Sequence, residues 1–215
     1  MSIADQKRVM RAEFEGKLSS LDFFSLIEKS SRLSNQFLQF SQTNSAVFKN
    51  RYVVSFYPFE TEPQINIENE ARTEPFQVAY VRIENWKSGL MESREARRDT
   101  PDLWEEFELK NGNRIFQPRT TQPICEPNRI CAILVPGLAF TREGVRLGRG
   151  VGFYDRYLAK HPEALRIGVA FEDQIAAVIP TESWDENLDV LLTDQALYST
   201  NSYGEWKIHG KVMNR

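Results

Sequence analysis

A short stretch of the chain, RLGRGVGFYDRYL at residues 146–158, combines the residue types that bind phosphate groups. Its three glycines stand at alternate positions, Gly148, Gly150 and Gly152. Glycine lets the backbone approach a ligand without a Cβ in the way, and backbone N–H groups at the start of a helix attract anions. Arg149 can add a charge-assisted hydrogen bond, and Asp155 has the carboxylate that Mg²⁺ binds beside phosphate oxygens. The stretch predicts a phosphate-binding loop that leads into a helix near Phe153.

The loop alone leaves a second interpretation open. Its GxGxG spacing is neither the GxGxxG pattern of dinucleotide-binding folds nor the GxxxxGK[ST] pattern of the P-loop. A glycine-rich turn that precedes a helix and binds nothing would carry the same residues. The elements around the loop are therefore needed to choose between the two interpretations.

The apolar run ICAILVPGLAF at residues 130–140 precedes the loop and must position it. A continuous apolar run that is interrupted by Pro136-Gly137 is typical of a strand buried on both faces, as in a parallel sheet. Ligands of open α/β sheets bind outside the carboxyl ends of the strands. We therefore expect the glycine loop to lie at that edge of a sheet.

Helical and strand patterns alternate along the rest of the chain. Helical spacing predicts helices over residues 4–18, 22–40 and 153–161, and strand patterns predict strands over 52–59, 76–83, 166–171 and 189–194 in addition to the apolar run. Asp22 is a suitable N-cap for the second helix. This alternation indicates the α/β class, as a single domain of three layers with a central, mostly parallel sheet flanked by helices. We assign residues 1–197 to this domain and residues 198–215 to a C-terminal extension.

Three segments are harder to interpret. Residues 84–114 predict a strand followed by a turn at Asn111-Gly112. Residues 115–128 are rich in Pro and Thr, which favours an extended loop, and residues 172–178 favour a helix or a turn.

Composition restricts the class of partner. The 215 residues carry a net charge of −3 with a pI of about 5.6, which argues against a nucleic-acid or anionic-membrane binder. Cys125 and Cys131 form no CxxC pair, and with only two histidines a four-ligand zinc site is not expected. The first residues lack the apolar segment of a signal peptide, and no apolar run approaches the roughly 20 residues of a membrane span. We expect a cytoplasmic monomer with reduced thiols that binds a small molecule.

Several motifs in order along the chain resemble one known family. The run LVPGLAFTREGVRLGRGVGFYDRYL at residues 134–158 resembles the signature of the 5-formyltetrahydrofolate cyclo-ligase family, also called methenyltetrahydrofolate synthetases. Residues 166–194, which begin RIGVAFEDQ, resemble the closing segment of that family. Three shorter matches lie upstream: KRVMRAEF at residues 7–14, YPFETEP at residues 57–63 and IFQP at residues 115–118. Five ordered matches are much more specific than the glycine loop alone.

The resemblance implies a reaction that uses ATP and Mg²⁺. ATP would phosphorylate the formyl oxygen of 5-formyltetrahydrofolate, N10 of the folate would attack the activated carbon, and phosphate would leave. The products would be 5,10-methenyltetrahydrofolate, ADP and phosphate. Such a transfer needs cations that offset the charge on the transferred group.

The resemblance also implies which residues carry this reaction. Its ATP-binding residues are Lys7, Arg11, Gly148, Arg149, Gly150, Gly152, Phe153 and Tyr154, with Arg149 as the catalytic cation nearest the transferred phosphate. Its metal-binding acids are Asp155 and, as a second one, Asp189; its folate-binding residues are Glu62, Tyr57 and Gln117. Lys7 and Arg11 are four residues apart, so they share a helix face and can reach one triphosphate.

Each of these roles has a plainer alternative. Lys7 and Arg11 are also the charges that an exposed helix face carries. Asp155 is an acid that the helix dipole favours in a first turn, and Asp189 is a residue type that commonly ends loops. In that interpretation the residues hold the fold and its surface, and bind nothing.

Departures from the family pattern concentrate on the side that would bind folate. Residues 60–114 match only loosely and include the charged run ESREARRDT, and Trp184-Asp185 stands where His-Asp is usual. Phe153 lacks the hydroxyl of the usual tyrosine. Two alternatives therefore stay open, because a fold does not fix its chemistry. One is a divergent relative that binds folate or nucleotide without turnover, and the other is a different phosphoryl-transfer enzyme on the same scaffold.

Overall fold

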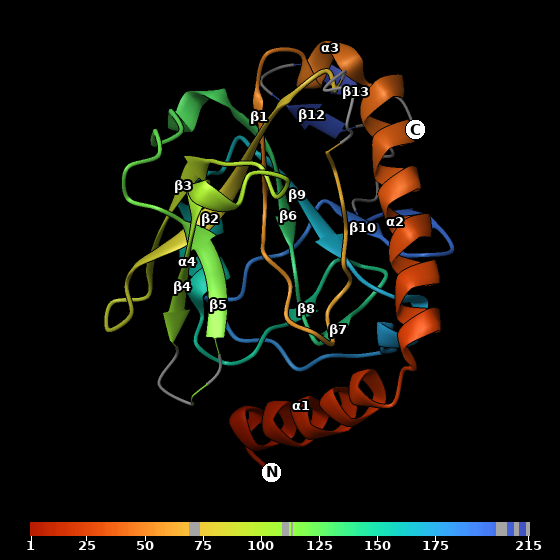
Figure 1. Ribbon diagram of the computed structural model, residues 1–215. Helices are drawn as coiled ribbons and strands as arrows, with labels where there is room; N and C mark the ends of the chain where they lie inside the picture. Colours follow the sequence, from red (N-terminus) through yellow and green to blue (C-terminus); the bar gives the residue numbers. More distant parts are fainter. Residues whose placement is uncertain (69–73, 109–111, 113, 201–205, 209–210, 214–215) are drawn as a thin grey trace.

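A seven-stranded sheet forms the centre of the computed structural model, which describes residues 1–68, 74–108, 112, 114–200, 206–208 and 211–213 (Figure 1). In spatial order its strands are β11 (Leu197–Ser199), β10 (Val190–Leu192), β9 (Leu165–Val169), β6 (Ile130–Val135), β1 (Tyr52–Ser55), β2 (Gln77–Asn85) and β3 (Leu90–Glu95). Every neighbouring pair from β10 to β2 is parallel, and the two edge strands, β11 and β3, are antiparallel to their neighbours. This arrangement confirms the predicted, mostly parallel α/β sheet.

The remaining strands form short two-stranded pairs. They are β4 (Trp104–Glu108) with β5 (Arg114–Pro118), β7 (Ala139–Phe140) with β8 (Arg146–Leu147), and β12 (Trp206–Ile208) with β13 (Lys211–Met213). The α-helices are α1 (Ile3–Ser19), α2 (Phe23–Thr43), α3 (Ser45–Phe48) and α4 (Phe153–Ala159), and single 3-10 turns cover Pro101–Leu103, Pro127–Arg129 and Glu172–Gln174.

Two apolar cores lie on the two faces of the sheet, because alternate side chains of a strand point to opposite faces. One core contains Val53, Leu134 and Val169 together with Phe14 of α1 and Phe37 of α2. The other contains Val54 and Ile133 together with Tyr157 and Leu158 of α4. The sheet therefore lies between helices on both faces, which confirms the flanked sheet that the sequence predicts.

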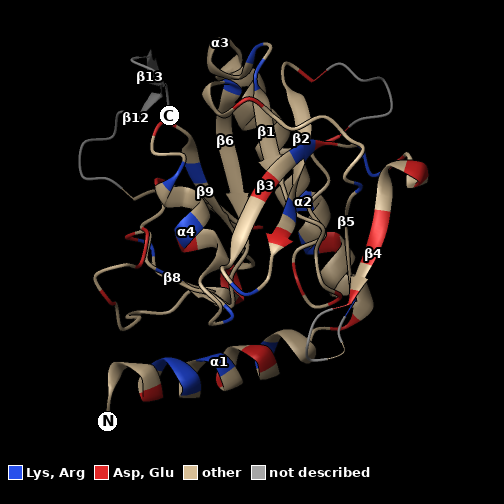
Figure 2. Cartoon of the chain, turned by 90° about the vertical axis from the view of Figure 1, so that its left-hand side faces the viewer, with Lys and Arg blue, Asp and Glu red and all other residues tan. Residues whose placement is uncertain are grey.

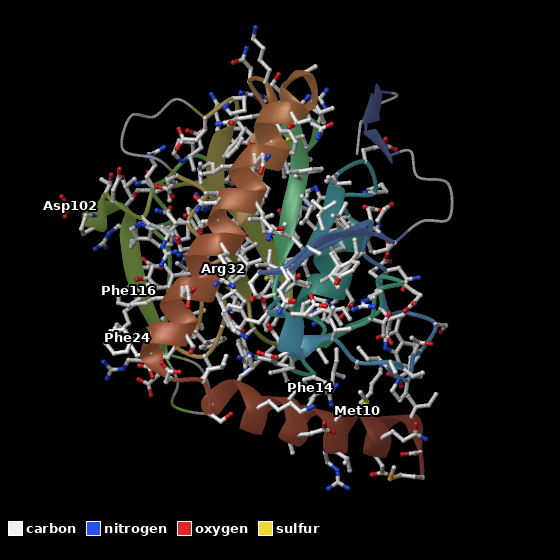
Figure 3. All side chains as sticks on the ribbon, turned by 90° about the vertical axis from the view of Figure 1, so that its right-hand side faces the viewer. Met10, Phe14, Phe24, Arg32, Asp102 and Phe116 are labelled. Atoms are coloured by element: carbon white, nitrogen blue, oxygen red, sulfur yellow. The ribbon has the colours of Figure 1, made fainter. Side chains whose placement is uncertain are left out.

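Helix α2 begins where the sequence places its N-cap, Asp22, and α1 begins at Ile3, one residue before the predicted start. The Asp22 carboxylate accepts hydrogen bonds from the N–H groups of Phe24 and Ser25, both at 3.0 Å, so it satisfies donors that the first turn leaves unpaired. Helix α1 crosses below the lower end of the sheet, past β7 and β8, rather than along a face (Figure 1). Phe14 is buried from the side of α1 that faces the sheet (Figure 3). The opposite side of α1 is open to solvent.

Several predicted elements differ from the structure. The strand predicted over residues 52–59 ends at Ser55, and the apolar run ends as a strand at Val135. The extended loop predicted over residues 115–128 is wrong at its start, because residues 115–118 pair with β4 as part of β5. Strand β3 was not predicted, because its charged residues do not form the apolar pattern of a strand. It is stabilised instead by antiparallel pairing with β2.

Two further predictions concern loops and the end of the chain. Gly112 has a φ of +81°, as the predicted turn requires, while Asn111 lies outside the described residues. The division at residue 197 stays a prediction; strand β11 spans that position. Cys125 and Cys131 are both buried, and burial raises the pKa of each thiol to about 12. Within the described residues, no helix has both the length and the apolar character that crossing a membrane requires.

Candidate functional site

A cleft of about 1250 Å³ opens at the carboxyl ends of β1 and β6, where an open α/β sheet is expected to bind its ligand. Helix α1, the β4–β5 pair, the glycine loop, α4 and residues 182–186 contribute to its walls. Of the predicted site residues, the cleft brings together Lys7, Arg11, Tyr57, Glu62, Gln117, Gly148, Arg149, Gly150, Gly152, Phe153, Tyr154 and Asp155. Residues far apart in the sequence therefore share one cavity of a size suited to small molecules.

The glycine loop takes a backbone shape that other residues rarely adopt. Gly150 and Gly152 have φ angles of +95° and +70°, in the left-handed region where a Cβ would clash. Gly152 is the N-cap of α4, which begins at Phe153 as predicted. Gly148 does not have a positive φ, so its role differs from that of the other two. The left-handed backbone at Gly150 and Gly152 thus lets the chain change direction sharply between β8 and α4.

Helix α1 closes one side of the cleft with two cations on one face. Arg11 Nε donates a hydrogen bond to the Gly148 carbonyl oxygen at 2.9 Å. One turn earlier, Lys7 is buried and its Nζ donates to Glu182 at 2.9 Å and to Asp185 at 2.6 Å. Burial alone would lower the pKa of Lys7, but the two carboxylates outweigh it and raise that pKa. Lys7 is therefore an ion-paired cation rather than a solvated surface charge, and Figure 2 shows α1 lying beneath the loops that it contacts.

The residues predicted for nucleotide and for folate meet in an ion pair. Arg149 Nη2 lies 3.0 Å from Glu62 Oε1, and Arg149 Nε donates to the same oxygen at 3.0 Å. Glu62 is 4% exposed, and its second oxygen accepts the Phe59 N–H at 3.0 Å. Burial raises the pKa of Glu62, and the Arg149 charge offsets part of that rise. The guanidinium of Arg149 also lies 4.8 Å from the centre of the Phe59 ring.

Asp155 lies in the cleft with a partner that the sequence interpretation missed. Arg146, which is buried, donates through Nη2 to Asp155 Oδ1 at 2.9 Å and through Nη1 to the Pro136 carbonyl oxygen at 3.2 Å. Arg146 Nε and the Tyr154 hydroxyl are both buried and have no hydrogen-bond partner in the described part of the chain. Buried polar groups are rarely left unpaired, so these two atoms favour a polar ligand beside them.

Asp189 does not join the cleft. Its carboxylate accepts the Arg166 N–H at 2.8 Å, and its own N–H donates to the Arg166 carbonyl oxygen at 2.9 Å. Burial raises its pKa, against the effect of that hydrogen bond. These contacts fit the alternative in which Asp189 ends a loop and binds no metal. Among the described residues, no three His, Cys, Asp or Glu side chains gather as a metal site.

The wall opposite α1 is aromatic and amide-bearing. The Tyr57 ring lies 5.3 Å from Trp104 and 5.0 Å from Phe116, centre to centre. Gln117 is buried, and its side-chain oxygen accepts the Ile83 N–H at 3.2 Å. Such a wall suits a flat, partly polar ring.

Sequence reasoning missed three residues that line the cleft: Arg146, Phe116 and Trp184. Arg146 had a signal, because it stands in the glycine-rich stretch two residues before Gly148. Phe116 stands in the IFQP motif and Trp184 in the closing segment, but nothing in their spacing assigns their side chains to the cleft. They reach the cleft through loops and a hairpin whose positions depend on packing.

Comparison with known proteins indicates one family. The model of the 5-formyltetrahydrofolate cyclo-ligase family matches residues 5–194. Proteins named 5-formyltetrahydrofolate cyclo-ligase from Mycoplasma genitalium and Haemophilus influenzae are 33% and 35% identical to this chain over 97 and 98 residues. These matches cover 43% and 44% of this chain and 52% and 49% of the relatives, so the chain spans about half the length of the relatives that it matches.

Solved structures show the same fold at lower identity. The NMR structure of Aquifex aeolicus 5,10-methenyltetrahydrofolate synthetase has a TM-score of 0.74 with 22% identity, and the match covers 94% of this chain and 97% of that one. A 5,10-methenyltetrahydrofolate synthetase from Mycoplasma pneumoniae has a TM-score of 0.62 with 18% identity over 87% of this chain and 98% of that one. Both likenesses support the three-layer α/β fold.

Proposed function

The chain belongs to the 5-formyltetrahydrofolate cyclo-ligase family, and from this membership and the cleft we propose that it converts 5-formyltetrahydrofolate to 5,10-methenyltetrahydrofolate with conversion of ATP to ADP and phosphate. In the proposed reaction the formyl oxygen attacks the terminal phosphorus of ATP, and ADP leaves. N10 of the folate then attacks the activated carbon and loses its proton, the C–O bond to the phosphorylated oxygen breaks, and phosphate departs with that proton. The protein acts mainly by positioning the reactants and offsetting charge.

The observation that carries the proposal is the 3.0 Å contact between Arg149 and Glu62. It brings the cation proposed for the transferred phosphate next to the acid proposed for the folate. In the proposed reaction, the phosphoryl group would pass from the nucleotide to the formyl oxygen beside this pair. A preformed cation there stabilises the charge that builds up in transfer.

The nucleotide side of the proposed site comprises α1 and the glycine loop. Lys7, Arg11 and the loop glycines Gly148, Gly150 and Gly152, followed by Phe153 and Tyr154, would hold the triphosphate. The Tyr154 hydroxyl and Arg146 Nε, which find no hydrogen-bond partner among the described residues, belong to side chains that line the cleft and could donate to such a ligand. The positive φ angles at Gly150 and Gly152 let the loop backbone come close to phosphate oxygens.

Asp155 is the residue proposed to hold Mg²⁺. A carboxylate together with phosphate oxygens and water suits this ion, which seldom relies on protein ligands alone. When bound, Mg²⁺ would neutralise phosphate charge. Asp155 now pairs with Arg146 at 2.9 Å, so it already lies beside a cation and can exchange that partner. Asp189, which lies outside the cleft, is not part of the proposed metal site.

The folate side of the proposed site is the wall formed by Tyr57, Glu62 and Gln117. Phe116 extends its aromatic surface, and the buried Trp104 packs against Tyr57. The flat pterin ring of a folate can stack on such a surface, and the Glu62 carboxylate can accept hydrogen bonds from the ring N–H groups. We further propose that the protein acts as a cytoplasmic monomer on this small molecule and needs no nucleic acid or membrane.

A spectrophotometric assay tests the proposal. The purified protein is mixed with 5-formyltetrahydrofolate, Mg²⁺ and ATP, and the methenyl chromophore is followed against an ATP-free control. We expect the chromophore to appear only with ATP. If it does not appear while calorimetry still detects ATP binding, the chain is a nucleotide-binding relative without this turnover, and other acceptors of the phosphoryl group must be sought.

A further inference from the structure

Trp184 combines a large apolar ring with high exposure at the edge of the cleft. Its side chain is 64% exposed and lines the same cavity as Lys7 and the glycine loop. Most tryptophan side chains in folded proteins are largely buried, so a tryptophan ring with this much exposure is unusual. Tryptophans on binding surfaces instead provide a flat face for a ligand.

A short, rigid turn presents this ring. The Glu182 N–H donates to Asp185 Oδ2 at 2.8 Å, and the Asp185 N–H donates to the Glu182 carbonyl oxygen at 3.1 Å. Lys7 holds both carboxylates, and Arg166 holds the next residue, Glu186, at 2.9 Å. The turn that carries Trp184 is therefore held at both ends, to α1 through Lys7 and to β9 through Arg166.

The turn lies beside the proposed phosphate site. Lys7, which holds the turn, and Arg11, which contacts Gly148, are four residues apart on α1. At a rise of about 1.5 Å per residue, their positions differ by about 6 Å along the helix axis. A nucleotide whose phosphates lie on the glycine loop therefore has Trp184 within reach of its base.

Among the described residues, the other tryptophan that lines the cleft is half-buried and already has an aromatic partner. Trp86, at the tip of the β2–β3 hairpin, makes an edge-to-face contact with Phe153, with ring centres 5.0 Å apart. Its ring thereby supports the start of α4. Trp184 is the better platform for an incoming base.

We propose that Trp184 is the stacking platform for the base of the bound nucleotide, an inference that rests on the proposed ATP site. Stacking on an aromatic ring is tolerant of base identity, because every base has a flat π-face. The platform would therefore favour a nucleotide over a bare polyphosphate. It would discriminate only weakly between adenine and guanine.

Binding measurements on single variants test this inference. Calorimetry gives the dissociation constants of ADP and of inorganic tripolyphosphate, each with Mg²⁺, for the unaltered protein, Trp184→Ala and Trp184→Phe. Val178→Ala is the matched control, since Val178 is an exposed apolar residue outside the cleft lining. Thermal melting shows that each variant folds.

We expect Trp184→Ala to weaken ADP binding about tenfold or more, the range found for loss of a base–aromatic stack. Trp184→Phe should recover most of that loss, and tripolyphosphate binding should not change in any variant. Equal ADP affinity in Trp184→Ala and the unaltered protein would overturn the inference and leave the proposed function intact. Failure of the unaltered protein to bind either ligand would overturn both.

Discussion

Arg149 and Glu62, 87 residues apart in the chain, share a 3.0 Å ion pair at the meeting point of the two halves of the cleft. Glu62 is almost fully buried, whereas Arg149 is 34% exposed and also lies 3.6 Å from Glu15 of α1. A ligand that draws Arg149 toward its phosphates therefore changes the charge that faces Glu62. The pair links the proposed nucleotide and folate sites through one contact.

The first prediction concerns Glu62→Gln. The amide keeps the shape of the side chain but cannot pair with Arg149 as a charge. We expect weaker folate binding and unchanged ATP binding, measured by calorimetry with each ligand separately. The reverse pattern would show that Glu62 belongs to the nucleotide side of the cleft.

The same variant has a predicted pH signature. Burial raises the pKa of Glu62 above its unfolded value of about 4.3. The stability that such a group contributes is fully present below its unfolded pKa and is lost as pH rises through its folded pKa. The Glu62→Gln variant does not suffer this loss. In urea titrations, its free energy of unfolding relative to that of the unaltered protein should therefore rise as the pH increases above about 4.3; a flat difference would contradict the sign of the shift.

The second prediction separates the chemical and structural roles of Arg149. We expect Arg149→Ala to lower kcat by about a thousandfold, because it removes a cation from the transferring group. It should also destabilise the fold by about 1–2 kcal/mol, less than for a fully buried pair because Arg149 is partly exposed. The double variant Arg149→Ala/Glu62→Gln should regain the stability and not the turnover. Near-normal turnover in Arg149→Ala would remove this residue from the mechanism.

Much of the fold could be predicted from the sequence because its signals are local. Asp22 begins α2 by a capping contact within three residues, and the apolar run at residues 130–135 has no alternative to burial. Strand β3 could not be predicted, since its charged side chains are held in place by β2 and by the chain around it. Arg94, for example, donates to the carbonyl oxygens of Thr120 and Gln122, which no pattern near residue 94 indicates.

In the candidate site, too, local features could be predicted from the sequence, whereas contacts between distant residues could not. Residues within one motif, such as Gly150 and Gly152, reach the cleft together because a single turn carries them. Asp189 shares a motif with the site in sequence, but its contacts with Arg166 keep it away. The pairing of Lys7 with the turn at residues 182–185 spans most of the chain, so only the packed fold determines it.

The third prediction uses this pairing. Lys7→Ala leaves Glu182 and Asp185 facing each other without a cation, and we expect a loss of about 2 kcal/mol in stability, below the full cost for buried pairs since both acids are partly exposed. The KM for ATP should rise as well. Lys17→Ala, on the same helix and exposed beside Glu13, is the matched control and should change neither quantity. If Lys7→Ala and Lys17→Ala had the same stability and the same KM for ATP, Lys7 would be no more than a surface charge.

The fourth prediction tests the glycine loop through the shape of its backbone. Gly150 has a φ of +95°, and a Cβ there would lie 3.2 Å from Arg11 Cζ. We expect Gly150→Ala to cost about 1–2 kcal/mol in stability from backbone strain. It should also weaken ATP binding, because the loop moves away from Arg11.

Two other glycines serve as controls for this variant. Gly16 of α1 has no neighbour within 4 Å of an added Cβ, so Gly16→Ala should stabilise the protein by about 0.5–1 kcal/mol. At Gly148, where φ is not positive, an added Cβ would lie 2.7 Å from Arg146 Nη1, so this variant must displace that side chain but adds no strain from a left-handed backbone. Gly148→Ala should therefore cost less stability than Gly150→Ala in thermal melts. If all three alanine variants melt alike, backbone strain does not explain the glycines of the loop.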